Sequence, residues 1–146
     1  MYKIRCKAIC LIINDNKMLV SEDFDTVNKD YLYCPLGGQI EFGELGEDTV
    51  KREFIEEIQE EIINVKYLAT LENIFVYNGQ TGHELVRIYI GELKNKNLYN
   101  IDEIYGFEGT SKFKVVWKPL IDFNNNILTL VPKGLSNLLK NYSYTS

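Results

Sequence analysis

The segment from residue 48 to residue 62 constrains the fold of this chain most, because a helix there separates charged from apolar side chains. At about 100° per residue, one helical face carries only glutamates, which are Glu53, Glu56, Glu57 and Glu60. The opposite half is apolar and contains Phe54, Ile55, Ile58 and Ile62. Glu47 or Asp48 can cap the N-terminus, where acidic groups suit the helix dipole. The pattern therefore predicts a helix over 48–62 that packs its apolar face on a sheet.

Alternating and continuously apolar stretches on both sides of this helix predict strands. We expect strands over residues 3–13, 17–21, 31–35, 65–76, 83–93 and 113–117, a loop over 22–30 and a long connection over 94–112. Pro132 begins a predicted helix over 132–139 whose leucines share one face, namely Leu135, Leu138 and Leu139. The order β-β-β-α-β-β-β-α is typical of the α/β class, as an α/β/α sandwich with a mixed β-sheet between helices.

Composition and charge limit the classes of function. The 146 residues fit a single domain over 1–146. A net charge of −5 argues against duplex nucleic acid as a partner, because that binding needs a basic surface. We expect no membrane span and no signal peptide, and three cysteines without a CxxC pair favour neither disulfides nor a zinc site. The cytoplasm is the expected compartment.

The clustered carboxylates of the predicted helix have two interpretations. Like charges at i,i+3 and i,i+4 repel by a few tenths of a kcal/mol per pair, yet an exposed acidic face tolerates this. Alternatively, the spacing lets several carboxylates converge on hard cations such as Mg²⁺, which prefer oxygen ligands. Gly37 and Gly38, followed by Gly43, permit close backbone approach and unusual dihedrals just before the helix, which favours the second interpretation.

The spacing of these residues resembles the box of the Nudix hydrolases, of the MutT-like kind. Gly38, five residues, Glu44, seven residues and then Arg52-Glu53-Phe54-Ile55-Glu56-Glu57 carry the resemblance, and Cys34-Pro35-Leu36-Gly37-Gly38 resembles the entry to the box. Outside the box, residues 72–75, 82–84, 117–120 and 132–135 resemble one bacterial subgroup. The family's usual glycine after the paired glutamates is Gln59 here, and we therefore expect the helix to continue toward Glu61 or Ile62.

The resemblance implies a Nudix fold and metal-dependent cleavage of a pyrophosphate bond. The substrate would be a nucleoside diphosphate linked to another moiety, or a nucleoside triphosphate, and the cofactor Mg²⁺ or Mn²⁺. The implied metal ligands are the Gly37 carbonyl with Glu53, Glu56, Glu57 and, from a late loop, Glu108, for which Glu103 is the runner-up. The catalytic set comprises Glu53, Glu57, Arg52 and Glu44, of which Arg52 and Glu44 are expected to act as support.

Substrate contacts are expected from four residues, which are His83, Glu84, Arg5 and Tyr33. His83 lies at a hairpin end and serves either as a structural residue or as a phosphate contact, whereas Arg5 suits a phosphate. Tyr33 could stack on a base, although its strand position also fits a core residue. Two alternatives remain open, a nucleotide-sensing module without turnover and an interaction domain with an acidic helix. Exposed sheet edges make a homodimer plausible.

Overall fold

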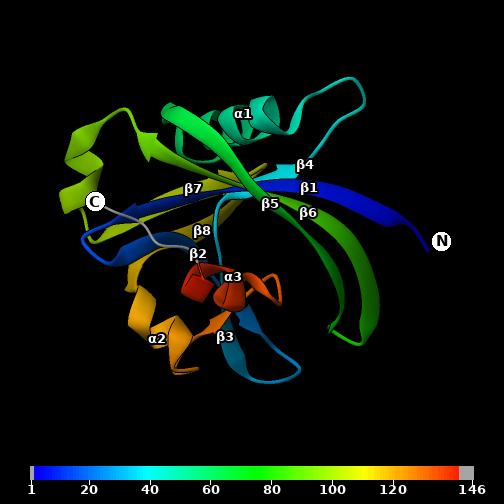
Figure 1. Cartoon of the computed structure of the whole chain (residues 1–146). Coiled ribbons are helices and arrows are strands. Elements are labelled where there is room, and N and C mark those ends of the chain that lie inside the picture. Colours follow the sequence, from blue (N-terminus) through cyan, green and yellow to red (C-terminus); the bar gives the residue numbers. More distant parts are fainter. Residues whose placement is uncertain (1, 142–146) are drawn as a thin grey trace.

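The computed structural model describes residues 2–141, in which helices lie on both faces of a mixed sheet (Figure 1). The strands are β1 (Ile4–Asn14), β2 (Lys17–Asp25), β3 (Asp30–Cys34), β4 (Gly37–Gln39), β5 (Ile62–Tyr77), β6 (Gln80–Leu93), β7 (Glu103–Glu108), β8 (Ser111–Pro119) and β9 (Thr129–Leu130). The helices are α1 (Gly46–Ile58), α2 (Leu120–Asn124) and α3 (Leu135–Asn141), with a 3₁₀ turn at Lys96–Asn100. The predicted α/β/α architecture is confirmed.

The sheet divides into two halves that join at one hairpin. β1 pairs with β6 in parallel and with β4 antiparallel, and β6 pairs with β5, which forms an edge. β2 pairs with β3 and β8, and β8 pairs with β7. Among the described residues, the two halves meet only through the short β1–β2 register at Ile13–Met18 and Asn14–Lys17. This arrangement brings β4, β7 and the same side of α1 together, because α1 contacts both strands.

Side chains of β1 alternate between two apolar cores, as a strand with both faces covered requires. Ala8 and Cys10 belong to the core that also contains Phe54 and Ile58 of α1. Ile9 belongs to the other core, which is closed by residues of α2 and α3, among them Phe123, Leu135 and Leu139. Phe54 and Ile58 are buried and fix the helix to the sheet, whereas Ile55, predicted for the same face, is 46% exposed.

Both ends of α1 differ from the prediction. The helix begins at Gly46, where an added Cβ would lie 2.3 Å from the Tyr89 hydroxyl oxygen, and Leu45 occupies the cap position without a side-chain hydrogen bond. Glu47 and Asp48 therefore lie in the first turn rather than at the cap. The helix ends at Ile58 and not at Glu61 or Ile62, because Gln59 adopts left-handed dihedrals (φ 59°, ψ 38°).

The remaining differences concern short elements. Residues 94–112, predicted as a long connection, contain the 3₁₀ turn, β7 and the start of its hairpin with β8. Residues 22–30, predicted as a loop, contain the end of β2 and the start of β3. The last helix begins at Leu135 rather than Pro132, and α2, β4 and β9 were not predicted. Within the described residues, none of the helices has the length and apolar character needed to span a bilayer.

Candidate active site

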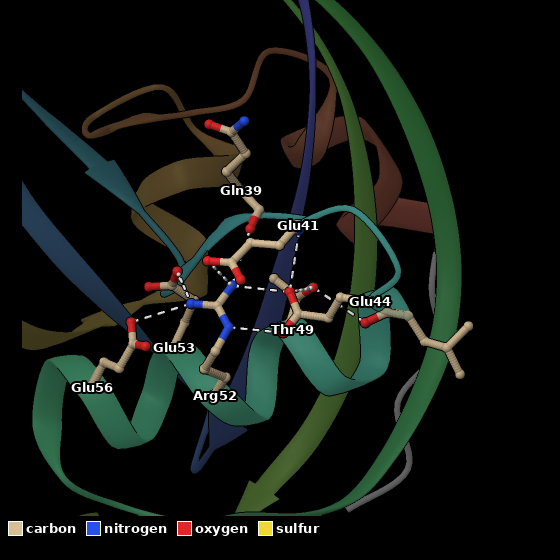
Figure 2. Close-up of polar contacts among 8 residues, drawn as sticks. Gln39, Glu41, Glu44, Thr49, Arg52, Glu53 and Glu56 are labelled. Atoms are coloured by element: carbon tan, nitrogen blue, oxygen red, sulfur yellow. Dashed lines mark hydrogen bonds and ion pairs between the residues drawn. The ribbon is translucent and has the colours of Figure 1, made fainter.

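Arg52 lies at the centre of a network of carboxylates from α1 and from the loop before it (Figure 2). Its Nε donates to Glu44 Oε2 at 2.8 Å, and its Nη2 donates to Glu44 Oε1 at 3.0 Å. Its Nη1 donates to Glu53 Oε1 at 3.0 Å and to Glu56 Oε2 at 3.2 Å. The guanidinium thus forms a two-pronged pair with Glu44 and a bridge between Glu53 and Glu56.

Glu44 is held from a second side by the first turns of α1. Thr49 is fully buried and donates its hydroxyl to Glu44 Oε1 at 2.7 Å. Hydrogen bonds from Arg52 and Thr49 lower the pKa of Glu44 to about 2, so that its carboxylate is charged over the neutral range. Glu44 fixes Arg52, and Arg52 in turn fixes Glu53. The sequence pattern did not indicate Thr49, although a hydroxyl in the first turn of a helix after an acidic loop residue is a usable signal.

Glu53 lies directly against the backbone of β4. A Cβ added to Gly38 would be 2.4 Å from the Glu53 Cδ and Oε1 atoms, so only glycine leaves room for this carboxylate. Gly37 is needed for a different contact, since its added Cβ would lie 2.0 Å from the Ala8 backbone oxygen of β1. Neither glycine has a positive φ, whereas Gly43 does (φ 84°). Close approach, and not unusual dihedrals, explains the Gly37-Gly38 pair.

Glu57 has the most perturbed acidity in the site. Burial, followed by the charge of Glu53 and a hydrogen bond with it, raises the pKa of Glu57 to about 8, and Glu108 of β7 adds to the effect. The charges of Glu53 and of Glu108, the late acid predicted from the sequence, therefore both act on Glu57. Glu103, the runner-up, instead pairs with Lys114 and with the Tyr105 hydroxyl.

The donor set fits a hard divalent cation. Carboxylate oxygens are the ligands that Mg²⁺ and Mn²⁺ prefer, and the mutual repulsion seen at Glu57 is what a bound cation relieves. Across residues 2–141, however, no three acidic, histidine or cysteine side chains lie close enough together to hold a metal ion as they stand. Arg52 accounts for part of this, because its guanidinium occupies oxygens of Glu53 and Glu56. The side chain of Glu56 is 57% exposed and free to turn.

The predicted substrate contacts are distributed over several places. Tyr33 is 4% exposed within the second core and donates its hydroxyl to Glu22 at 2.8 Å. A side chain buried in this way is not available to contact a substrate. His83 lies in β6 at the register position of Ile4 and Ile74, toward the β5–β6 hairpin end. Arg5 is exposed on β1 opposite Glu84, and Glu84 forms an ion pair with Lys7.

Comparison with known proteins gives one family and one fold. Residues 4–129 match the model of the NUDIX domain. A NUDIX hydrolase from Nitrosomonas europaea has a TM-score of 0.68 at 16% identity, over 96% of this chain and 88% of that one. A MutT NUDIX hydrolase from Burkholderia pseudomallei has a TM-score of 0.65 at 18% identity, over 97% of this chain and 99% of that one.

A structure described as an ADP compounds hydrolase has a TM-score of 0.55 at 16% identity, over 85% of this chain and 63% of that one. The chain matches no curated protein significantly. At these identities the structures show the fold, whereas the domain model covers most of the chain and shows the family. The chain therefore belongs to the NUDIX family, and it is a hydrolase with a MutT-like fold.

Proposed function

We propose that this hydrolase uses Mg²⁺ or Mn²⁺ to cleave a pyrophosphate bond in a nucleoside diphosphate linked to another moiety, or in a nucleoside triphosphate. The observation that carries the proposal is the position of Glu53, which is held between Gly38 and Arg52, beside Glu57, whose pKa the charges of Glu53 and Glu108 raise. Grouped carboxylates that repel one another are costly without a cation, and a phosphoanhydride substrate also requires one.

Four residues of this chain would hold the metal, namely Gly37 through its carbonyl and Glu53, Glu56 and Glu57 through their carboxylates, with Glu108 as a further ligand. When bound, the metal supplies neutralisation of phosphate charge and acidification of a water. Glu53 or Glu57 accepts a proton from the attacking water, since each is a carboxylate at the site. Arg52 and Glu44 orient Glu53, which makes them positioning residues.

The experiment is a substrate panel that includes ADP-linked compounds, because one structural neighbour is described as an ADP compounds hydrolase. Products are measured with Mg²⁺, with Mn²⁺ and with chelator. We expect metal-dependent hydrolysis by the wild type and a loss of at least about 100-fold in Glu57→Gln. Glu60→Gln is the matched control, because Glu60 lies beyond the end of α1 and outside the proposed ligand set. Equal activity of wild type and Glu57→Gln would exclude the proposed site.

The alternatives give different results in the same panel. A sensing module binds a nucleotide tightly under either metal without turnover, and an interaction domain shows no metal-induced thermal shift. The chain keeps the carboxylates that metal-dependent turnover needs, which favours the enzyme.

Self-association and compartment stay predictions. β5 is an edge strand of 16 residues with exposed Ile74 and Val76, a surface that fits a homodimer. Light scattering coupled to size exclusion measures the mass directly. A cytoplasmic location and the substrate contacts of His83, Glu84 and Arg5 likewise remain to be tested.

A further inference from the structure

The network around Arg52 joins long side chains that do not fix one another by themselves. The side chains of Glu44, Arg52 and Glu53 are 17%, 24% and 15% exposed, and each has several rotatable bonds. Ordering such side chains costs conformational entropy. A guanidinium paired with two carboxylates can therefore shift together with them unless one member of the network is held by a rigid group.

Thr49 supplies a rigid contact from the first turn of α1. Its side chain is short and branched at Cβ, which leaves few χ1 rotamers in a helix, and it is fully buried. Its backbone amide donates to the Leu45 carbonyl oxygen at 3.0 Å, as in a regular helix. The position of the Thr49 hydroxyl is therefore set by the backbone of α1.

The hydroxyl proton of Thr49 has two possible acceptors and favours the one in the network. Glu44 Oε1 is 2.7 Å from Thr49 Oγ1, whereas the Leu45 carbonyl oxygen is 3.2 Å away. A hydroxyl has one proton to donate, and the shorter contact goes to a charged oxygen, where hydrogen bonds are stronger. Glu44 is consequently tied to α1 by Thr49 as well as by Arg52, which lies about one turn further along the helix.

Two further contacts tie the network to backbone atoms, and both are longer. Arg52 Nη2 donates to the Gln39 carbonyl oxygen of β4 at 3.2 Å, and the Glu41 amide donates to Glu44 Oε1 at 3.3 Å. The 2.7 Å bond from Thr49 is therefore the shortest of the three. We infer that it fixes the Glu44 carboxylate more firmly than the other two contacts do.

We propose that Thr49 is a positioning residue for the proposed metal ligand Glu53, an inference that rests on the proposed function. Glu44 Oε1 accepts from Thr49 and also from Arg52 Nη2, the latter at 3.0 Å (Figure 2). Arg52 Nη1 then donates to Glu53 Oε1 at 3.0 Å. The buried hydroxyl thus sets where the Glu53 carboxylate lies before a metal ion binds, and Thr49 itself touches neither metal nor substrate.

The test compares Thr49→Val, which removes the hydroxyl and keeps the shape of the side chain, with Thr49→Ser, which keeps the hydroxyl. Mn²⁺ binding to the full chain is measured by calorimetry, so the readout does not depend on turnover. Residues that orient metal ligands contribute about 10- to 100-fold to metal affinity, and Thr49→Val should raise the Kd for Mn²⁺ about 10-fold. Thr49→Ser should restore most of the affinity.

A double-mutant cycle separates positioning through Glu44 from a general structural role. Glu44→Ala removes the acceptor of the Thr49 hydroxyl together with the partner of Arg52. If Thr49 acts through Glu44, adding Thr49→Val to Glu44→Ala should leave the Kd for Mn²⁺ where Glu44→Ala alone puts it. Independent effects of the two substitutions, which multiply in Kd, would contradict the proposed route.

Ser21→Ala is the matched control, because it also loses a single hydroxyl hydrogen bond, to the Cys34 carbonyl oxygen at 3.2 Å, outside the network. It should leave the Kd for Mn²⁺ and kcat unchanged. Circular dichroism melts establish that the variants fold, and Thr49→Ala replaces Thr49→Val if the latter does not. Equal Mn²⁺ affinity of wild type and the folded Thr49 variant would overturn the inference, and so would an absence of Mn²⁺ binding to the wild type.

Kinetics distinguish a failure of this inference from a failure of the proposed function. On the best substrate of the panel with saturating Mn²⁺, Thr49→Val should lower kcat about 10-fold with little change in KM, because a displaced Glu53 impairs the reaction rather than substrate binding. A rise in KM at unchanged kcat would contradict the assignment. A wild type that hydrolyses nothing in the panel defeats the proposed function, whereas the Mn²⁺ titrations still decide the role of Thr49.

Discussion

At the scale of single residues, Gly37 and Gly38 shape the site because neighbouring atoms lie where a side chain at either position would begin. Each glycine excludes a Cβ, but their neighbours differ in rigidity. Gly38 faces the flexible end of Glu53, and Gly37 faces the backbone of Ala8 in β1. The same substitution at adjacent positions should therefore separate chemistry from stability.

Gly38→Ala should reduce hydrolysis by about 10- to 100-fold with little change in stability, because the methyl group displaces the Glu53 carboxylate and leaves the strands paired. Gly37→Ala should destabilise the fold, since Ala8 cannot move without disrupting the β1–β4 pairing. Urea unfolding and initial rates measured on both variants check this contrast. Equal losses of stability in Gly37→Ala and Gly38→Ala would contradict this contrast, because they would mean that β4 moves as a whole in both variants.

Glu44 gives a pH dependence whose sign follows from its pKa. The folded-state pKa is lowered from 4.5 to about 2, so the stabilisation is complete above about 4.5 and is lost as the pH falls toward 2. Glu44→Gln lacks this contribution at every pH. The stability difference between wild type and Glu44→Gln, measured by urea unfolding, should be constant near neutrality and shrink on acidification below about 4.5. A difference that grows on acidification would contradict the ion-pair assignment.

At the scale of elements, α1 combines an apolar face that packs on the sheet with a C-terminus closed by backbone hydrogen bonds. Gly46 begins the helix where an added Cβ would meet the Tyr89 hydroxyl, and the amides of Gln59 and Glu60 donate to the carbonyls of Ile55 and Phe54. Gln59 occupies left-handed backbone that glycine adopts without steric cost. The hydrogen bonds that close the last turn therefore hold Gln59 in a backbone conformation that residues with a side chain disfavour.

Gln59→Gly should stabilise the protein by about 1 kcal/mol, because it removes the left-handed strain. The corresponding rise in Tm is roughly 2–4 °C for a chain of this size. Gln59→Ala is the control, since alanine has the same strain and should give no gain. A lower Tm for the glycine variant would mean that the Gln59 side chain contributes more than its backbone costs.

The extent of prediction differs between elements for physical reasons. Periodicity indicated α1 and the long strands, because a buried face of regular spacing is visible in the residues themselves. It missed β7 and α2, whose few residues gain their order from β8 and from the second core. Glu53 and Glu57 followed from spacing, whereas Thr49 was missed because its hydroxyl meets Glu44 only once the loop folds back on the first turn of α1.

At the scale of the whole molecule, the two cores hold α1 and the β7–β8 hairpin in place, so that the acidic side chains of the site repel one another in the folded protein. Phe54 and Ile58 anchor α1 on one side, and the β7–β8 hairpin carries Glu108 to the same place. Because the scaffold holds these charges together, metal binding and global stability are linked. The sign of an active-site substitution on Tm should consequently depend on the metal.

Without metal at neutral pH, Glu57→Gln should be at least as stable as the wild type, because the raised pKa of Glu57 means that its carboxyl must take up a proton on folding, whereas an amide need not. With Mn²⁺ at 100-fold its Kd, the wild type gains about 2.7 kcal/mol, or roughly 5–10 °C, and the variant gains much less. The two melting curves should therefore exchange order when the metal is added. Differential scanning calorimetry with chelator and with Mn²⁺ measures both states, with Glu60→Gln as the variant that should follow the wild type. If Glu57→Gln melts below the wild type in chelator, its carboxylate stabilises the fold and the repulsion inferred at this site is wrong.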